Sequence, residues 1–287
     1  MNISVVIPTY NEECCIGNCL EALINGTEKP FEIIVADGLS VDQTREIAKQ
    51  YGAIVVKNKK RHAAGGRNAG IKRAKGEVIA FIDADCIPDT NWLEEIRNAF
   101  ESEPDLDGLG TYIRPAEPEN LLEEFWGKVS LQIMMSYGLD SYYVTEKSLN
   151  TAFITASCAY KKDLLKKIRG FSNFFANNAE DVDLCWRALD AGAKLKYVPD
   201  AKITAHSPTT LKGIRKKSFR NGVSSSKLQK RYSDHKISID KNLYKALVKN
   251  IIGILKKERY AKLFVYEICF HLLGKYYGSI RYGVVNI

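Results

Sequence analysis

The stretch VIAFIDAD, residues 78–85, decides the fold, because five apolar residues lead directly into two aspartates. A short unbroken apolar run is typical of a strand in a parallel sheet that is covered on both faces. Similar runs come earlier, at residues 3–7, 32–36 and 54–56, and candidate helices lie at 12–25, 41–51, 64–75 and 90–101. This alternation of strand and helix predicts a doubly wound α/β domain.

Asp83 and Asp85 end the fourth predicted strand. In an extended segment, side chains two residues apart point the same way. Two carboxylates brought together repel one another unless a proton or a cation lies between them. Mg²⁺ and Mn²⁺ are typically held by one or two carboxylates together with phosphate oxygens of a ligand. The pair therefore predicts a divalent metal site, with a helix-capping turn before Trp92 as the alternative.

Other polar groups follow the earlier strands, where ligands bind in doubly wound sheets. Asp37 can accept hydrogen bonds from a nucleobase or a ribose. The segment PTYNE, residues 8–12, offers backbone and hydroxyl groups after the first strand, although a plain turn also explains it. The small-residue helix start AAGGRNAG, residues 63–70, suits close approach of a phosphate, and Arg67 adds a positive charge. No Gly-x-Gly-x-x-Gly follows the first strand, which argues against an NAD enzyme.

The second half regains a regular pattern after a looser region at 104–150, where one helix is expected near 119–135. A strand at 152–160, helices at 161–168 and 180–191, and a strand at 194–198 follow. The acidic segment EDVD, residues 180–183, opens the second of these helices. Acids are favoured at helix N-termini, so compensation of the helix dipole is one interpretation of this segment and a catalytic role is the other.

As an ordered set, these motifs resemble the inverting family 2 glycosyltransferases, which have the nucleotide-diphospho-sugar transferase (GT-A) fold. The likeness covers roughly residues 3–206 and is carried by VVIPTYNE at 5–12, DG at 37–38 with Ser40 and Asp42, RNAG at 67–70, FIDAD at 81–85 and NAEDVDL at 178–184. It implies a doubly wound, mostly parallel sheet. Residues 1–110 would form a nucleotide-sugar-binding half, 111–210 an acceptor and catalytic half, and 211–287 a basic helical C-terminal extension.

The resemblance also implies roles for single side chains. Asp85 would bind the metal, Asp83 would face the ribose or the metal, and His206 resembles a histidine that completes the metal site or touches the diphosphate in some relatives. Asp181 would be the general base that deprotonates the acceptor hydroxyl, with Glu180 as the second candidate. Inversion by direct displacement needs one base opposite the leaving group, and a metal stabilises the departing diphosphate. The nucleotide-sugar would meet Pro8, Thr9, Tyr10, Glu12, Asp37, Arg67 and Asp83.

Charge divides the chain into two parts. Residues 211–287 carry 18 Lys and Arg against 4 Asp and Glu, a net charge of +14, while residues 1–210 have a net charge of −6. A basic extension favours an anionic partner, either a phospholipid surface or a nucleic acid. Nucleic acid is disfavoured because the presumed site is acid-rich.

The extension also has the pattern of a helix that lies on an anionic membrane surface, although a solvated helix face is the alternative. No apolar run reaches the roughly 18–20 residues that span a bilayer. The pattern consists of the cations Lys212, Arg215, Lys216, Lys217 and Arg220, followed by the apolar stripe Leu243, Leu247, Ile251, Ile254 and Leu255 beside Lys241, Lys245 and Lys249.

The sequence thus predicts a metal-dependent inverting hexosyltransferase that uses Mn²⁺ or Mg²⁺ and a UDP- or GDP-linked sugar. The acceptor would be a glycan or a lipid-linked molecule on the cytoplasmic, inner face of the cell membrane, and no nucleic acid partner is expected. Because the Gln-x-x-Arg-Trp motif of processive synthases is absent, addition of a single sugar is favoured. Two alternatives stay open: a sugar-phosphate nucleotidyltransferase, which would need a glycine-rich basic loop where PTYNE stands, and a non-enzymatic basic membrane-binding module.

Overall fold

The computed structural model describes residues 1–135, 140–147, 152–176, 178–233, 252 and 258–284. Within these ranges the strands are β1 (Ile3–Thr9), β2 (Glu32–Asp37), β3 (Ile54–Lys57), β4 (Val78–Ile82), β5 (Cys86–Pro88), β6 (Gly108–Pro115), β7 (Tyr142–Val144), β8 (Ser157–Lys161) and β9 (Leu195–Ala205). The helices are α1 (Ile16–Asn25), α2 (Thr44–Gln50), α3 (Ala63–Arg73), α4 (Trp92–Ser102), α5 (Leu121–Met135), α6 (Lys162–Lys167), α7 (Glu180–Asp190), α8 (Leu211–Arg231) and α10 (Glu258–Tyr282), with a 3₁₀ turn at Asn173–Phe175.

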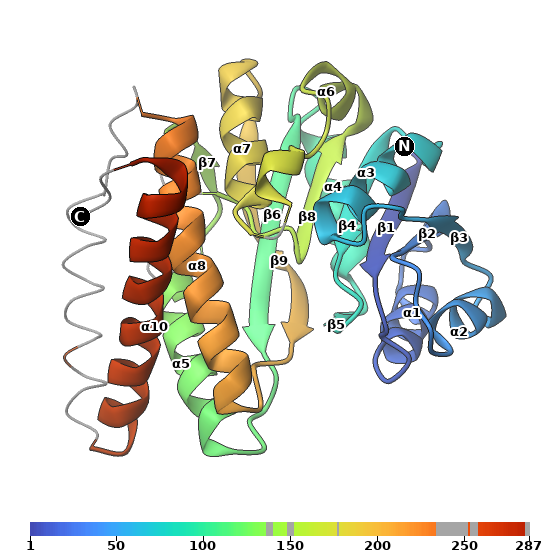
Figure 1. Ribbon diagram of the computed structural model, residues 1–287. Helices are drawn as coiled ribbons and strands as arrows, with labels where there is room; N and C mark the ends of the chain where they lie inside the picture. Colours follow the sequence, from blue (N-terminus) through green and yellow to red (C-terminus); the bar gives the residue numbers. More distant parts are fainter. Residues whose placement is uncertain (136–139, 148–151, 177, 234–251, 253–257, 285–287) are drawn as a thin grey trace.

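The described strands form one sheet in the order β3-β2-β1-β4-β8-β6-β9-β5, with β7 paired to β9 (Figure 1). From β3 to β4 every pairing is parallel. Beyond β4 the sheet is mixed, because β8 runs antiparallel between β4 and β6 while β6 and β9 are parallel. The four strands predicted in the first hundred residues are confirmed to within two residues at each end.

Alternation along β1 explains why helices cover both faces of this sheet. Val5 and Ile7 belong to one buried apolar cluster together with residues of α1 and α4. Val6 points to the opposite face and belongs to a second cluster with Ala64 of α3. Strands buried on both faces read as continuous apolar runs, which is why their sequence signal was strong.

Three strands were missed by the sequence, and β6 shows why. A Cβ added to Gly108 would lie 2.4 Å from the Tyr160 ring, and one added to Gly110 would lie 2.3 Å from the Phe153 ring. Glycine is required at both positions for close packing, yet it weakens the strand signal. The short strands β5 and β7 were missed as well. β9 runs past the expected end at residue 198 through a register shift opposite Thr111 and Tyr112. The expected division into halves at residue 110 stays a prediction, and β6 runs across it.

Close packing of α3 on β1 gives a testable consequence. A Cβ on Gly70 would lie 2.2 Å from Val6 Cγ1. We expect Gly70→Ala to lower the free energy of unfolding by about 1–3 kcal/mol, because overpacking a dense core outweighs the helix propensity of alanine. Urea denaturation measures this. Gly17→Ala in α1 is the matched control, since its nearest neighbours are 3.8 Å away, and equal losses at both glycines would contradict the packing argument.

The C-terminal helices α8 and α10 lie side by side, next to α5 (Figure 1). Their backbones touch, because a Cβ on Gly222 would lie 2.0 Å from the His271 carbonyl oxygen and one on Gly274 would lie 2.1 Å from that of Phe219. The predicted apolar stripe from Leu243 to Leu255 and its lysines lie outside the described residues. In the parts of the chain that are described, no helix has both the length and the apolar character needed to cross a bilayer.

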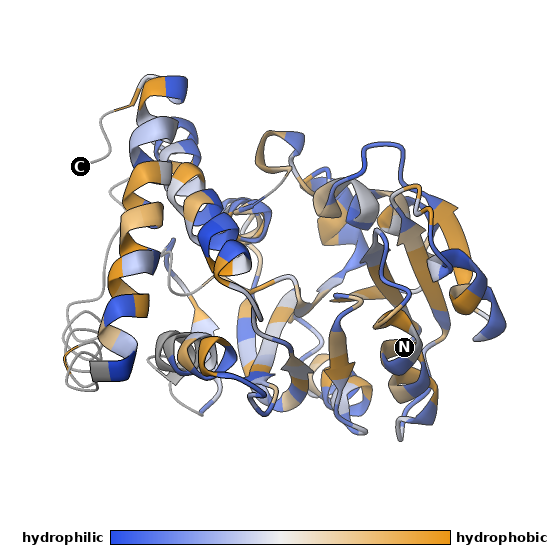
Figure 2. Cartoon of the chain, turned by 60° about the horizontal axis from the view of Figure 1, so that its bottom comes forward, coloured by the Kyte–Doolittle hydropathy of each residue, from blue (hydrophilic) through white to orange (hydrophobic). Residues whose placement is uncertain are grey.

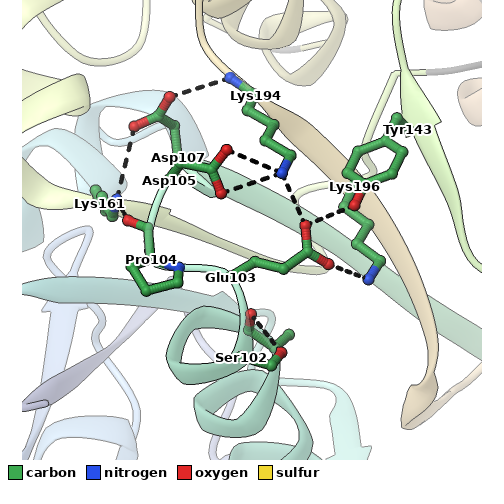
Figure 3. Close-up of polar contacts among 10 residues, drawn as sticks. Ser102, Glu103, Pro104, Asp105, Asp107, Tyr143, Lys161, Lys194 and Lys196 are labelled. Atoms are coloured by element: carbon green, nitrogen blue, oxygen red, sulfur yellow. Dashed lines mark hydrogen bonds and ion pairs between the residues drawn. The ribbon is translucent and has the colours of Figure 1, made fainter.

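A polar network lies at the amino ends of β6 and β9 (Figure 3). Glu103 accepts hydrogen bonds from Lys196 and from the Tyr143 hydroxyl, and forms an ion pair with Lys194. These contacts lower the pKa of Glu103 to about 2. Lys194 also pairs with Asp105. Since lysines balance these acids, the network fastens the end of α4 to β7 and β9, and we assign it a structural role.

Candidate active site

The structure brings the predicted strand-end residues to one edge of the sheet. Thr9 ends β1 directly opposite Asp37, the last residue of β2, in the parallel register. On the other side of β1, β4 runs parallel and leads into Asp83. These three residues therefore share the carboxyl edge, where doubly wound sheets bind ligands.

The loops after β1 and β2 brace one another. The Asn11 amide donates to Ser40 Oγ at 2.9 Å, and the Glu12 amide donates to Thr44 Oγ1 at 2.8 Å. Asn11 Oδ1 in turn accepts from the Val41 amide at 3.0 Å. Asn11 adopts a left-handed backbone with φ 55°, a conformation that asparagine tolerates better than most residues. These contacts give Glu12 a fixed place at the edge.

Asp37 and Thr9 are buried beneath these loops. The Asp37 carboxylate accepts hydrogen bonds from the amides of Leu39 and Ser40, both at 3.1 Å. Part of its hydrogen-bonding capacity therefore stabilises the turn that follows β2. Thr9 Oγ1 is buried and, among the described residues, has no hydrogen-bond partner. An unsatisfied buried hydroxyl is rare enough to require an explanation, and a bound ligand would provide one. Tyr10, in contrast, is half exposed.

Arg67 joins the two halves of the site. Its guanidinium is buried, donates from Nη2 to Asp83 Oδ1 at 2.7 Å and from Nη1 to Glu180 Oε1 at 2.9 Å, and lies 5.6 Å from the centre of the Phe171 ring. The sequence placed Arg67 at the phosphate of a nucleotide. In the structure both of these donors are engaged by carboxylates, one after β4 and one at the start of α7.

The small residues at the start of α3 serve packing. A Cβ on Gly66 would lie 3.0 Å from Pro8 Cβ, so this glycine lets α3 approach β1. The Gly65 amide donates to His62 Nδ1 at 2.9 Å. His62 therefore caps the helix end that was predicted to bind a phosphate. This capping role was missed because histidine is not among the common N-cap residues.

Asp181 stands out among the three acids that open α7. Glu180 is paired with Arg67, and the buried Asp183 is held by Arg187 at 2.7 Å and by the Tyr232 hydroxyl at 2.8 Å. Asp181 has no ion-pair partner in the described part of the chain, and its Oδ1 accepts a hydrogen bond from the Val182 amide at 2.8 Å.

The environment of Asp181 suits a base. The pKa of the Asp181 carboxyl is raised to about 7, mainly by burial and then by the negative charge of Glu180. The hydrogen bond from the Val182 amide acts in the opposite direction and lowers this pKa. A general base works best when its pKa lies near the operating pH. Perturbed acids of this kind cluster at functional sites. The geometry therefore favours Asp181 over Glu180 as the base.

The carboxylates around Asp85 carry excess negative charge. Asp85 is exposed. The pKa of Glu12 is raised to about 7, first by burial and then by the negative charges of Asp85, Asp83 and Asp42. Burial and Asp85 also raise the pKa of Asp83, while Arg67 opposes them. Hard oxygen donors that repel one another fit a divalent cation such as Mg²⁺ or Mn²⁺.

His206 directly follows β9. Cys86 pairs with Ala205 in the antiparallel register, so Asp85 and His206 are the next residues of the two chain segments beyond this pair. The potential ligand atoms of Asp83, Asp85 and His206 do not all lie within 4.8 Å of one another. A cation held mainly by one or two carboxylates and by ligand phosphate does not require that spacing.

A second acidic and thiol cluster exists nearby. Within the described ranges, the one set of three potential ligand atoms lying within 4.8 Å of one another belongs to Glu12, Cys14 and Cys15. Burial and the neighbouring Cys14 raise the pKa of Cys15 to about 12. A thiol that stays protonated is a poor metal ligand, so this set is a weaker metal site than Asp83 and Asp85.

Lys217 of α8 is a further candidate site residue, although the sequence predicted it to be one of the membrane-facing cations. It is half-buried, and its ammonium lies 5.0 Å from the centre of the Trp126 ring. Burial lowers its pKa, whereas the charges of Asp85 and Asp83 act to raise it. Lys217 therefore lies near the acidic edge, and the only sequence signal for it was the basic character of the extension.

An α/β sheet with acidic residues gathered at its carboxyl edge is the architecture of the nucleotide-diphospho-sugar transferases, the GT-A fold. More narrowly, residues 4–169 match the family described as "Glycosyl transferase family 2", and the chain belongs to this family. The predicted family and fold class are confirmed, and the protein is a glycosyltransferase. This membership sets aside the nucleotidyltransferase and the non-enzymatic module.

Three known proteins illustrate the similarity. Glycosyltransferase AglE of Haloferax volcanii is 28% identical over 229 residues, which cover 77% of this chain and 71% of AglE. The Methanococcus voltae dolichyl N-acetyl-alpha-D-glucosaminyl phosphate 3-beta-D-2,3-diacetamido-2,3-dideoxy-beta-D-glucuronosyltransferase is 26% identical over 234 residues, which cover 77% of this chain and 72% of the relative. Among solved structures, glucosyl-3-phosphoglycerate synthase from Mycobacterium tuberculosis, crystallised with Mn²⁺, UDP-glucose and glycerol 3-phosphate, has a TM-score of 0.56 at 17% identity, over 80% of this chain and 79% of that one.

Proposed function

We propose that this glycosyltransferase is metal-dependent and inverting, and that it transfers a hexose from a UDP- or GDP-linked donor to a glycan or lipid-linked acceptor. The observation that carries the proposal is the contrast between two groups of acids. Asp181 has no ion-pair partner among the described residues and has a pKa of about 7, whereas Asp83 and Asp85 supply a cluster of negative charge beyond the end of β4. Arg67 spans the space between the two groups.

The division of labour follows from this arrangement. Asp181 accepts the proton of the acceptor hydroxyl as that oxygen attacks the anomeric carbon, and the donor diphosphate departs on the opposite side. A divalent cation held by Asp85 and Asp83, with His206 as a further ligand, supplies positive charge to the diphosphate when it is bound. Lys217 adds a second positive charge near the same carboxylates.

The nucleotide would lie over the ends of β1 and β2. Thr9 Oγ1 lacks a partner among the described residues and Asp37 keeps lone pairs beyond those that shape its turn. The group Pro8, Thr9, Tyr10, Glu12, Asp37, Arg67 and Asp83 is proposed to surround the donor. Of these, Arg67 would act mainly by holding Asp83 in place, because its two terminal nitrogens, Nη1 and Nη2, already pair with Glu180 and Asp83.

The C-terminal helices support a membrane-bound acceptor. One face of α10 exposes large apolar side chains at helical spacing, among them Val265, Leu272 and Ile280, which are 57%, 55% and 68% exposed, and Figure 2 shows apolar positions along this helix. An exposed apolar face beside basic residues is typical of helices that lie in a membrane interface. The name of the Methanococcus voltae relative specifies a dolichyl phosphate-linked acceptor. We therefore place the enzyme on the inner, cytoplasmic face of the cell membrane as a peripheral protein.

A panel of nucleotide-sugars tests the proposed activity. With Mn²⁺ present and no acceptor, we expect slow hydrolysis of one UDP- or GDP-sugar, with release of the nucleoside diphosphate, and loss of this release when EDTA removes the metal. Proton NMR of the first product of transfer would then show inversion at the anomeric carbon. If neither UDP- nor GDP-linked donors are hydrolysed, or if hydrolysis is the same in EDTA, the proposed donor and metal assignments are wrong.

A further inference from the structure

A cleft of about 430 Å³ lies between α8 and α10, apart from the strand ends that form the active site. Its walls combine four cations with two aromatic rings: Lys212, Arg215, Lys216, Phe219, Arg220 and Phe270. The two helices run parallel, since Arg215 stacks over the Phe270 ring at 5.8 Å while Ser226, further along α8, bonds to the Lys275 carbonyl oxygen. Their close contact at Gly222 and Gly274 fixes the spacing of the walls.

The cations of this cleft have no acidic partner in the described residues, although the same protein pairs many of its other basic groups. Arg97, for example, pairs with Glu28, and Lys194 pairs with Glu103 and Asp105. Four unpaired positive charges in one hollow repel one another and attract an anion. The planar guanidinium group of arginine matches the geometry of a phosphate and can bind it through two hydrogen bonds.

We propose that this cleft binds the phosphate headgroup of a polyprenyl-phosphate-linked acceptor, with Phe219 and Phe270 in contact with the first isoprene units. This inference rests on the proposed function, because it assumes a lipid-linked acceptor. The cations supply the charge complementary to phosphate, and the two rings supply an apolar surface that a soluble phosphate would not use. Leu273, three residues beyond Phe270 on α10, is 53% exposed, and side chains at this spacing are neighbours on a helix, so the lipid chain can continue from Phe270 along α10 into the membrane interface.

The position of the cleft also fits an acceptor that must reach the donor. Arg220 lines the cleft and is three residues beyond Lys217 on α8, and side chains at this spacing are neighbours on a helix. Lys217 is near Asp85 and Asp83. A headgroup in the cleft is therefore adjacent to the face of α8 that borders the active site. One helix, α8, thus contributes residues both to the cleft and to the border of the active site.

Vesicle binding by paired variants of α8 tests the proposal. Arg215→Gln/Arg220→Gln removes two charges from the cleft, and Lys230→Gln/Arg231→Gln removes two exposed charges from the far end of the same helix. Binding of the full chain is measured by flotation with phosphatidylcholine vesicles that contain polyprenyl monophosphate, and with vesicles of equal surface charge that contain phosphatidylglycerol. We expect the cleft variant to lose at least about a hundredfold in affinity for the polyprenyl phosphate vesicles, since each charge-assisted contact from an arginine to a bound phosphate contributes about tenfold or more. Its loss on phosphatidylglycerol should be smaller.

The outcomes separate this inference from the proposed function. Equal losses in both variants on both vesicles would mean diffuse attraction to any anionic surface, and no loss in the cleft variant would mean an unused cleft, so either result overturns the inference. Hydrolysis of the nucleotide-sugar, measured without lipid, reports on the donor site alone. If the wild-type chain hydrolyses its donor while the cleft variant binds polyprenyl phosphate normally, the cleft assignment fails and the proposed activity stands. If no donor is hydrolysed, the proposed activity itself fails.

Discussion

Asp181→Asn is expected to lower the rate of sugar transfer by about 10²–10⁴-fold, the contribution of a positioned general base, and to leave donor binding nearly unchanged. Asparagine preserves the shape of the side chain but cannot take the proton from the acceptor hydroxyl. The nucleotide is proposed to bind beyond β1 and β2, and the metal beyond β4, so neither contact involves Asp181. Initial rates with the identified donor, together with donor binding by calorimetry, measure the two effects separately.

The pH dependence of the same residue provides a second check. Because its pKa is raised to about 7, kcat/KM of the wild type should fall tenfold per pH unit below that value. The raised pKa also means that the folded protein disfavours the charged form, so the stability associated with Asp181 is greatest at low pH and is lost as pH rises through 7. We therefore expect Asp181→Asn to be at least as stable as the wild type at pH 8.

Glu180→Gln is the matched control for this prediction. It weakens a buried ion pair with Arg67, so it should lower the thermal stability, because a buried guanidinium would lose its charged partner. A stable Asp181→Asn protein that retains full turnover would transfer the role of base to Glu180.

The sequence predicted most of the parallel half of the sheet because its strands, such as β4, are buried on both faces and contain only apolar residues. It failed at β6 because the residues that allow close packing there, Gly108 and Gly110, are those that typically indicate a turn. Strand signals depend on side chains, whereas β6 is defined partly by the absence of side chains at two positions. Local sequence carries no information about the rings of Tyr160 and Phe153 that fill the vacated space.

Prediction of the candidate site from the sequence was limited in the same way, because some of its contacts join residues that are far apart in the chain. Asp83 and Asp85 were predicted as candidate site residues because an apolar strand leads directly into them, and that context is local in the sequence. The ion pair between Arg67 and Glu180 joins residues 113 positions apart, and Lys217 approaches Asp85 from a helix that no local pattern places there. The charges of Arg67 and Lys217 were visible in the sequence, but their partners depend on how α7 and α8 pack against the sheet.

Asp85→Asn is expected to abolish the metal-dependent part of donor binding. In the wild type, UDP or GDP should raise the melting temperature only when Mn²⁺ or Mg²⁺ is present, because the repelling carboxylates of Asp85 and Asp83 need a cation before a diphosphate can approach. A ligand at one hundred times its Kd stabilises the folded state by about 2.7 kcal/mol, and this increment should disappear in the variant. Thermal denaturation with each nucleotide, with and without metal, measures the difference.

The metal-free protein should respond to the same substitution in the opposite direction. The charge of Asp85 is the second cause, after burial, of the raised pKa of Glu12, so its removal should lower that pKa and ease the ionisation of Glu12 at neutral pH. A carboxyl whose pKa is raised on folding costs stability as pH rises through the raised value, and the variant should therefore be slightly more stable than the wild type at pH 8 without metal. Asp163→Asn, on the exposed surface of α6, should show neither effect. If nucleotide and metal stabilise Asp85→Asn as much as the wild type, the cation is held elsewhere and Asp85 loses its assigned role.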